Sequence, residues 1–176
     1  SKGKFMVVSP DEGGIPRAMY YASILGVPLG TFYKRRDYTT VVNGRNPIIA
    51  HEFLGDSVEG LDILIVDDMI SSGDSMLDIA REMKERGARK VFCAVTFGLF
   101  TEGIDKFNKA YEEGVINKIF ATNATYRRPE LLEAPWYADV NLCKFVALLI
   151  DAINHDASLS NLISPTEKIK RLLNEK

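Results

Sequence analysis

The chain has 176 residues, enough to bury a hydrophobic core in a single domain without disulfide or metal staples. It carries 22 Lys and Arg residues against 24 Asp and Glu residues, which gives a net charge of -2. Proteins that bind nucleic acids concentrate positive charge, so this balance predicts no nucleic-acid partner. No apolar run approaches the ~18 residues that a membrane span needs. We therefore expect neither a membrane span nor a secretory signal peptide.

The two cysteines, Cys93 and Cys143, both lie inside apolar runs. This placement predicts buried, reduced thiols in a cytoplasmic protein rather than a disulfide or a metal site. The apolar sequence of the first strand begins at Phe5, almost at the start of the chain, so we expect further polypeptide before it.

Strand-like and helix-like segments alternate along the chain. Runs of β-branched and aromatic residues predict strands over residues 5–8, 28–33, 61–66, 90–96 and 118–122. Apolar residues at helical spacing predict helices over residues 15–25, 75–86, 104–112 and 143–154. Gly87 and Gly114 stand where helix C-caps are expected. We predict that residues 37–47 form a mobile loop.

This alternation predicts an α/β fold with a doubly wound, mostly parallel sheet flanked by helices. We expect one domain over residues 1–163, followed by a C-terminal helical tail over residues 164–176. Ligands of such sheets bind beyond the C-terminal ends of the strands. The segments that follow strand ends are therefore expected to form the site.

The most informative stretch runs from Leu61 to Leu77. An apolar strand is followed by Asp67 and Asp68, then by the loop Ser71-Ser72-Gly73-Asp74-Ser75, and then by a helix. Backbone N–H groups and the dipole at a helix N-terminus attract an anion, and the serine hydroxyls add donors. The acid pair suits sugar hydroxyls or a divalent cation. The alternative is an ordinary turn with a serine N-cap and two solvated carboxylates.

A run of three cations, Lys34-Arg35-Arg36, closes the second predicted strand. At a strand's C-terminal end and before a long loop, such cations suit the neutralisation of charge on a transferred phosphoryl group. A solvated basic strand edge is the alternative.

The stretch from Val66 to Ser75 resembles the phosphoribosyl-diphosphate (PRPP) motif of type I phosphoribosyltransferases. Further segments in the same order are similar to the catalytic C-terminal half of ribose-phosphate pyrophosphokinases (PRPP synthetases), from about Phe5 to Leu162; these are Ser9-Pro10-Asp11-Glu12-Gly13-Gly14, Lys34-Arg35-Arg36 and residues 94–100. The resemblance implies a type I phosphoribosyltransferase-like fold and ribose 5-phosphate or PRPP bound at Ser71, Ser72, Gly73, Asp74 and Ser75. It also implies Asp67 and Asp68 near the ribose hydroxyls, Lys34 and Arg36 as catalytic cations, and Asp11 as a Mg²⁺ contact.

The sequence departs from the family pattern in ways that predict a divergent member. Asp74 stands where a second loop glycine is usual, so it faces away from the phosphate, binds a cation or weakens the site. The loop over residues 37–55 is longer than usual, and residues 126–137 are unlike the common pattern. The adenine-binding segments and a metal-binding histidine belong to an N-terminal half that this chain does not resemble.

Three functions remain open on the sequence alone. The first is diphosphate transfer from ATP to ribose 5-phosphate with Mg²⁺, giving PRPP and AMP, and residues 9–14 and 34–36 favour it. The second is a phosphoribosyltransferase that consumes PRPP, and the third is a non-catalytic PRPP- or ribose 5-phosphate-binding regulatory domain. We expect the isolated chain to be inactive, because part of the ATP site would come from the missing half. The resemblance also implies a homo-oligomer.

Overall fold

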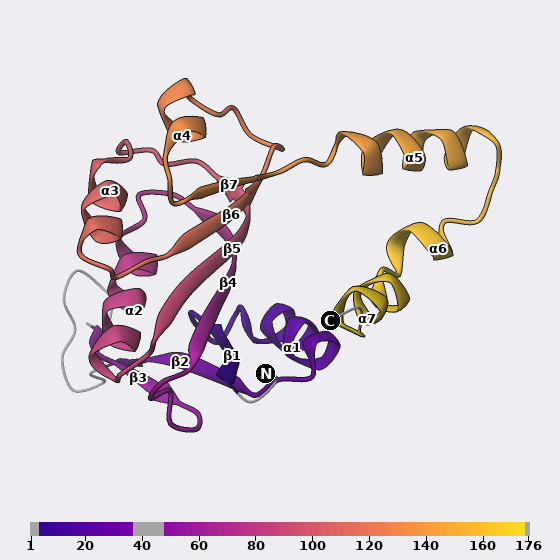
Figure 1. Cartoon of the computed structure of the whole chain (residues 1–176). Helices are drawn as coiled ribbons and strands as arrows, with labels where there is room; N and C mark the ends of the chain where they lie inside the picture. The colour runs from indigo at the N-terminus through magenta and orange to yellow at the C-terminus, as the bar shows by residue number, and fades with distance from the viewer. Residues whose placement is uncertain (1–3, 37–47, 175–176) are drawn as a thin grey trace.

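The computed structural model describes residues 4–36 and 48–174, with a single sheet whose strand order is β3-β2-β1-β4-β5-β6-β7 (Figure 1). Neighbouring strands are parallel except for the antiparallel pair β2 and β3. The strands are β1 (Phe5–Ser9), β2 (Leu29–Arg36), β3 (Ile48–Leu54), β4 (Asp62–Ile70), β5 (Lys90–Gly98), β6 (Lys118–Thr122) and β7 (Tyr137–Val140).

Helices cover both faces of this sheet, which confirms the predicted doubly wound α/β class. Helix α1 (Ile15–Leu25) lies on one face, and α2 (Asp74–Glu85) and α3 (Asp105–Glu112) lie on the other (Figure 1). The remaining helices are α4 (Pro129–Glu133), α5 (Cys143–Asn154), α6 (Ser160–Ile163) and α7 (Thr166–Asn174). Helix α7 lies against α1. No helix among the described residues is long and apolar enough to cross a membrane.

Strand β4 carries the core on both of its faces because successive side chains of a strand point to opposite sides. Ile63 and Ile65 are fully buried against the α2 and α3 side, whereas Leu64 and Val66 pack with Ala18 of α1. A central strand covered on both faces has no polar face, so its sequence is a continuous apolar run. This is the signal from which the strand was predicted.

Several element boundaries differ from the prediction, and the differences concern the ligand edge. Strand β4 extends to Ile70, so Asp67 and Asp68 belong to the last residues of the strand rather than to a following turn. Residues 48–54 form β3, which pairs with β2 and shortens the expected long loop over residues 37–55. Residues 37–47, predicted to be a mobile loop, lie outside the described residues.

The segment over residues 126–137 and the residues directly after it form elements that we did not predict, the short helix α4 and the edge strand β7. Strand β7 is only four residues long and includes Asp139, so it lacks the run of β-branched and aromatic residues by which the five predicted strands were recognised. It pairs with β6 and continues the sheet beyond the expected edge. The predicted division at residue 163 stays a prediction.

Helix α5 follows β7 and leaves the sheet instead of folding back over it (Figure 1). Its apolar side chains are therefore exposed, with Ile150 and Ile153 each 63% accessible. This position also overturns one prediction, because Cys143 at the start of α5 is exposed. Cys93 in β5 is buried as predicted, and its burial raises the pKa of the thiol to about 12.

Candidate functional site

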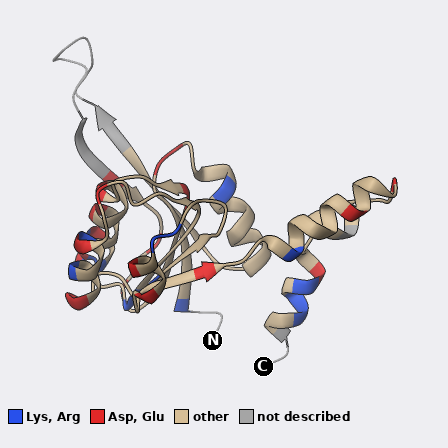
Figure 2. Ribbon diagram, turned by 90° about the horizontal axis from the view of Figure 1, so that it is seen from above, with Lys and Arg blue, Asp and Glu red and all other residues tan. Residues whose placement is uncertain are grey.

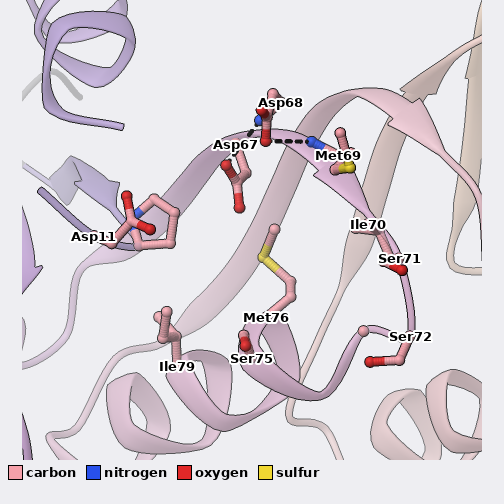
Figure 3. Close-up of a pocket in the computed structure, with 12 residues that line it drawn as sticks. Asp11, Asp67, Asp68, Met69, Ile70, Ser71, Ser72, Ser75, Met76 and Ile79 are labelled. Atoms are coloured by element: carbon pink, nitrogen blue, oxygen red, sulfur yellow. Dashed lines mark hydrogen bonds between the residues drawn. The ribbon is translucent and has the colours of Figure 1, made fainter. Parts of the chain in front are cut away.

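A cavity of about 240 Å³ opens at the C-terminal ends of β1 and β4, where the fold predicts a ligand. Figure 3 shows Asp11 on one side of it, Ser71 and Ser72 on the other, and the side chain of Met76 between them. The structure therefore brings together most residues that the sequence singled out. The lining consists of Pro10, Asp11, Asp67, Asp68, Met69, Ile70, Ser71, Ser72, Gly73, Ser75, Met76 and Ile79.

The loop between β4 and α2 has a fixed backbone. Its carbonyl groups accept hydrogen bonds from the segment after β5, from Leu99 N–H to Ile70 O at 2.9 Å and from Thr101 N–H to Ser71 O at 3.0 Å. Within α2 the N–H of Leu77 bonds to the carbonyl of Gly73 at 2.9 Å. The N–H groups before Leu77 lie in the first turn of the helix, where they have no intrahelical acceptor and can bind an anion.

Gly73 is the N-cap of α2, which differs from the serine N-cap considered for an ordinary turn. Its backbone is left-handed, with φ of 96°, and it offers no side-chain cap. An added Cβ would lie 2.1 Å from Cζ of Phe107, a fully buried residue of α3. A glycine lets the backbone approach a ligand closely, and the structure shows a second reason for glycine here, which is the Phe107 ring packed directly behind it.

The acid pair is held by a cation from the neighbouring helix. Arg17 of α1 places one guanidinium nitrogen 3.2 Å from Oδ1 of Asp67 and another 3.8 Å from Oδ2 of Asp68. Asp67 Oδ1 also accepts the N–H of Asp68 at 2.8 Å, and Asp68 Oδ1 accepts the N–H of Met69 at 2.8 Å (Figure 3). The carboxylates are thereby oriented at the rim of the cavity.

The surroundings of Asp67 and Asp68 shift the pKa values of the two carboxyl groups in opposite directions. Partial burial raises the pKa of Asp67 above its ordinary value, and the proximity of Asp68 adds to the rise. Burial acts in the same direction on Asp68, but its hydrogen bonds with Asp67 and Met69 and the charge of Arg17 outweigh burial and lower its pKa. The pair thus carries excess negative charge that Arg17 offsets only in part, so it can bind a cation or the hydroxyl groups of a sugar.

Asp74, the residue that departs from the family pattern, is absent from the cavity lining. Its Oδ1 lies 2.7 Å from Nζ of Lys106, and its Oδ2 accepts a hydrogen bond of 2.9 Å from Oγ of Ser72. The hydrogen bonds from Lys106 and Ser72 hold the pKa of Asp74 below its usual value. Of the outcomes that we considered, the structure supports a carboxylate that faces away from the cavity and is paired with a cation.

Asp11 lies at the cavity in the turn between β1 and α1. Its Oδ1 accepts the N–H of Gly14 at 2.9 Å, and its carbonyl accepts the hydroxyl of the buried Ser9 at 2.7 Å. These bonds fix the turn beside the acid pair. Within the described part of the chain, no group of three or more His, Cys, Asp or Glu residues is gathered closely enough to hold a metal.

The predicted catalytic cations cannot be placed in the same way. Lys34 and Arg36 belong to the last residues of β2, and the pairing with β3 shifts register between Arg35 and Arg36. Their side chains lie outside the part of the structure that is described. Their role therefore remains a prediction.

The sequence did not single out Arg17 or Lys106 for the roles that they take at the site. Arg17 belongs to the helix start that follows the family-like turn over residues 9–14, but nothing in that pattern links it to the acid pair. The neighbours of Lys106 in the chain give no signal. Lys106 lies 32 residues from its partner Asp74 and Arg17 lies 50 residues from Asp67. Figure 2 shows basic and acidic residues interspersed along the described chain.

The chain belongs to the phosphoribosyl transferase domain family, which matches residues 2–123. The match includes β1, α1, the acid pair, the loop at Ser71–Ser75 and α2. It ends at the sixth strand, and helix α5 lies beyond it.

Within this family the chain is similar to ribose-phosphate pyrophosphokinases. It is 38% identical to the one from Mycoplasma pneumoniae over 124 residues, which cover 70% of this chain and 36% of the relative. It is 32% identical to the one from Vibrio cholerae over 160 residues, which cover 90% of this chain and 48% of the relative. The chain thus spans less than half the length of these relatives, and the similarity lies in their C-terminal half.

A solved structure supports the fold. The phosphoribosylpyrophosphate synthetase from Mycobacterium smegmatis superimposes with a TM-score of 0.71 and 24% sequence identity. The superposition covers 88% of this chain and 46% of that protein. The predicted family resemblance and the type I phosphoribosyltransferase-like fold are both confirmed.

Proposed function

We propose that this chain forms the ribose 5-phosphate side of a ribose-phosphate pyrophosphokinase, a cytoplasmic enzyme that transfers diphosphate from ATP to ribose 5-phosphate. The supporting observation is the cavity at which the loop Ser71–Ser75 meets the acid pair Asp67 and Asp68, in a chain that is 32–38% identical to such enzymes. The phosphate binds at the N–H groups of the loop and of the first turn of α2. The ribose hydroxyls face the acid pair.

In the proposed reaction the anomeric hydroxyl of ribose 5-phosphate attacks the β-phosphorus of ATP. The bond from that phosphorus to the oxygen bridging it to the α-phosphate breaks, and AMP leaves, which gives PRPP. Such a transfer depends on in-line positioning and on stabilisation of the charge that spreads over the phosphoryl oxygens. Lys34 and Arg36 supply the positive charge that stabilises these oxygens in this proposal. The adenine-binding part of the ATP site comes from polypeptide outside this chain.

The carboxylates at the proposed site are suitable ligands for Mg²⁺, although they do not form a complete coordination shell by themselves. The ion prefers oxygen ligands and is commonly held by one or two carboxylates together with substrate phosphates and water. Asp11 and Asp67 line one cavity and supply carboxylates of this kind. When bound, the ion would neutralise charge on the diphosphate.

Calorimetric titration of the chain with ribose 5-phosphate tests the binding half of the proposal. Ser75 is exposed and lines the cavity, so Ser75→Asp places a negative charge beside the phosphate and should weaken binding on the order of tenfold or more. Ser23→Asp, on the exposed side of α1 and outside the cavity lining, is the matched control and should bind as the native chain does. If Ser75→Asp and Ser23→Asp bind equally well, the phosphate is not at this loop.

An assay of AMP release in the presence of ATP, Mg²⁺ and ribose 5-phosphate tests the reaction. The isolated chain should release no AMP, whereas an active enzyme that contains it should. In that enzyme Lys34→Ala and Arg36→Ala should each lower turnover on the order of 10²–10³-fold, and Arg35→Ala should change it little. Equal small losses of turnover in all three variants would mean that Lys34, Arg35 and Arg36 form only a solvated basic strand edge. Consumption of PRPP with a nucleobase, without AMP release, would identify a phosphoribosyltransferase instead.

We also propose that the chain self-associates through α5. Five apolar side chains of this helix are between 40% and 63% accessible, and apolar patches of this kind mark interaction surfaces; they are Phe145, Val146, Leu148, Ile150 and Ile153. Light scattering should show a dimer that Ile150→Glu dissociates. A native chain that stays monomeric at high concentration would contradict this part of the proposal.

A further inference from the structure

The phosphate loop of this chain contains an acid, and its charge has to be accommodated if a phosphate binds there. Asp74 is the first residue of α2, adjacent to the N-cap Gly73. An ionised carboxylate so close to the helix N-terminus competes with an anionic ligand for the same dipole and repels it. A loop with Asp74 uncompensated would therefore be a poor site for a phosphate dianion.

Lys106 compensates this charge from the adjacent helix. Its Nζ lies 2.7 Å from Oδ1 of Asp74 and 2.6 Å from Oε2 of Glu102, so the ammonium group is held from two sides. The Lys106 side chain is only 26% accessible, whereas the carboxylate of Asp74 is 64% accessible. The lysine is thus constrained, and the acid is drawn toward α3.

The Ser72 hydroxyl holds the second oxygen of the Asp74 carboxylate. The Ser72 hydroxyl donates to Oδ2 of Asp74 at 2.9 Å, while Oδ1 of the same carboxylate is taken by Lys106. Lys106 and Ser72 together therefore fix both oxygens of Asp74 outside the cavity. Without the lysine, Asp74 could turn toward the loop N–H groups and occupy the place of the phosphate.

We propose that Lys106 is a positioning residue for ribose 5-phosphate, which neutralises Asp74 and keeps its carboxylate outside the phosphate loop. The proposal rests on the function proposed above, because it needs the phosphate at Ser71–Ser75. Lys106 does not line the cavity, so it acts through Asp74 and not by contact with the ligand.

A double-mutant cycle tests this role by titration calorimetry with ribose 5-phosphate, repeated with inorganic phosphate. Lys106→Met should weaken binding on the order of tenfold, because it leaves an unneutralised carboxylate at the first residue of α2, next to the proposed phosphate site. Asp74→Asn should bind at least as tightly as the native chain. In the Asp74→Asn background, Lys106→Met should have a much smaller effect, because the carboxylate in the loop is gone and only Glu102, which lies outside the cavity lining, is left without its cation.

Two controls separate this role from a merely structural one. Lys106→Arg keeps the charge and should restore native affinity. Lys109→Met removes another cation of α3, one that is 74% accessible and pairs with Glu113, and should change nothing. Melting temperatures without ligand confirm that each variant is folded, and Lys106→Gln replaces Lys106→Met if the latter does not fold.

The outcomes are distinguishable. Equal losses on Lys106→Met in the native and the Asp74→Asn backgrounds would make Lys106 a direct phosphate ligand and overturn the proposal. Native affinity of Lys106→Met would overturn it as well, while leaving the proposed function intact. If the native chain, Asp74→Asn and Lys109→Met all fail to bind ribose 5-phosphate, the proposed function itself is wrong.

Discussion

Replacing Gly73 by alanine tests the construction of the loop between β4 and α2. The backbone at Gly73 has φ of 96°, and an added Cβ would lie 2.1 Å from Cζ of Phe107. The ring cannot move aside easily, because Phe107 is fully buried with its ring centroid 5.4 Å from that of Trp136 and 5.0 Å from that of Phe100. The substitution therefore meets both a conformational and a packing penalty.

The two penalties can be separated with a matched control. A left-handed conformation costs a non-glycine residue about 1–2 kcal/mol, and overpacking a core typically costs about 1–3 kcal/mol. Gly73→Ala should thus lower the free energy of unfolding by about 2–5 kcal/mol. At Gly26, φ is 65° and an added Cβ would have nothing within 4 Å, so Gly26→Ala should cost only the conformational part.

Urea unfolding of both variants, followed by tryptophan fluorescence, measures the difference. Combining Gly73→Ala with Phe107→Leu should recover part of the loss, because the smaller side chain frees the space that Cβ needs. If Gly73→Ala costs no more than Gly26→Ala, the buried ring does not constrain the loop and the steric argument fails. A displaced loop should also bind ribose 5-phosphate more weakly, which calorimetry would show.

Three further predictions concern other contacts. Arg17→Met leaves the Asp67–Asp68 pair without its cation, so Mg²⁺ should raise the melting temperature of this variant more than that of the native chain; equal shifts would contradict the assigned contact. The pKa of Asp62 is lowered chiefly by its hydrogen bond with Arg89, so its contribution is present above pH 3.8 and is lost as pH falls through the lowered pKa. Acid titration of stability should accordingly show a shallower decline in Asp62→Asn. The buried indole N–H of Trp136 donates to Asn108 at 2.8 Å, so Asn108→Leu should cost about 1–3 kcal/mol in urea unfolding, whereas Asn108→Asp keeps an acceptor and should cost less.

The local patterns of the sequence were sufficient for the class of fold and for most of the residues that the structure gathers around one cavity. Strand β4 is followed directly by the small polar loop and then by α2. These consecutive segments are therefore neighbours in space as well as in the chain. Gly87 and Gly114 follow α2 and α3 with φ of 88° and 71°, as C-cap glycines should. Such features depend on neighbouring residues, and sequence reasoning can therefore find them.

The features that remained hidden all join residues that are far apart in the chain. The pairing of Asp74 with Lys106, the position of Phe107 behind Gly73 and the bridge from Arg17 to the acid pair arise only when helices pack on the sheet. The short edge strand β7 and the departure of α5 from the sheet likewise depend on which surfaces are already covered. A local pattern specifies which face of a helix is apolar, but it does not specify which charged side chain of another helix meets it. Only the tertiary structure decided that Asp74, at the start of α2, has Lys106 beside it.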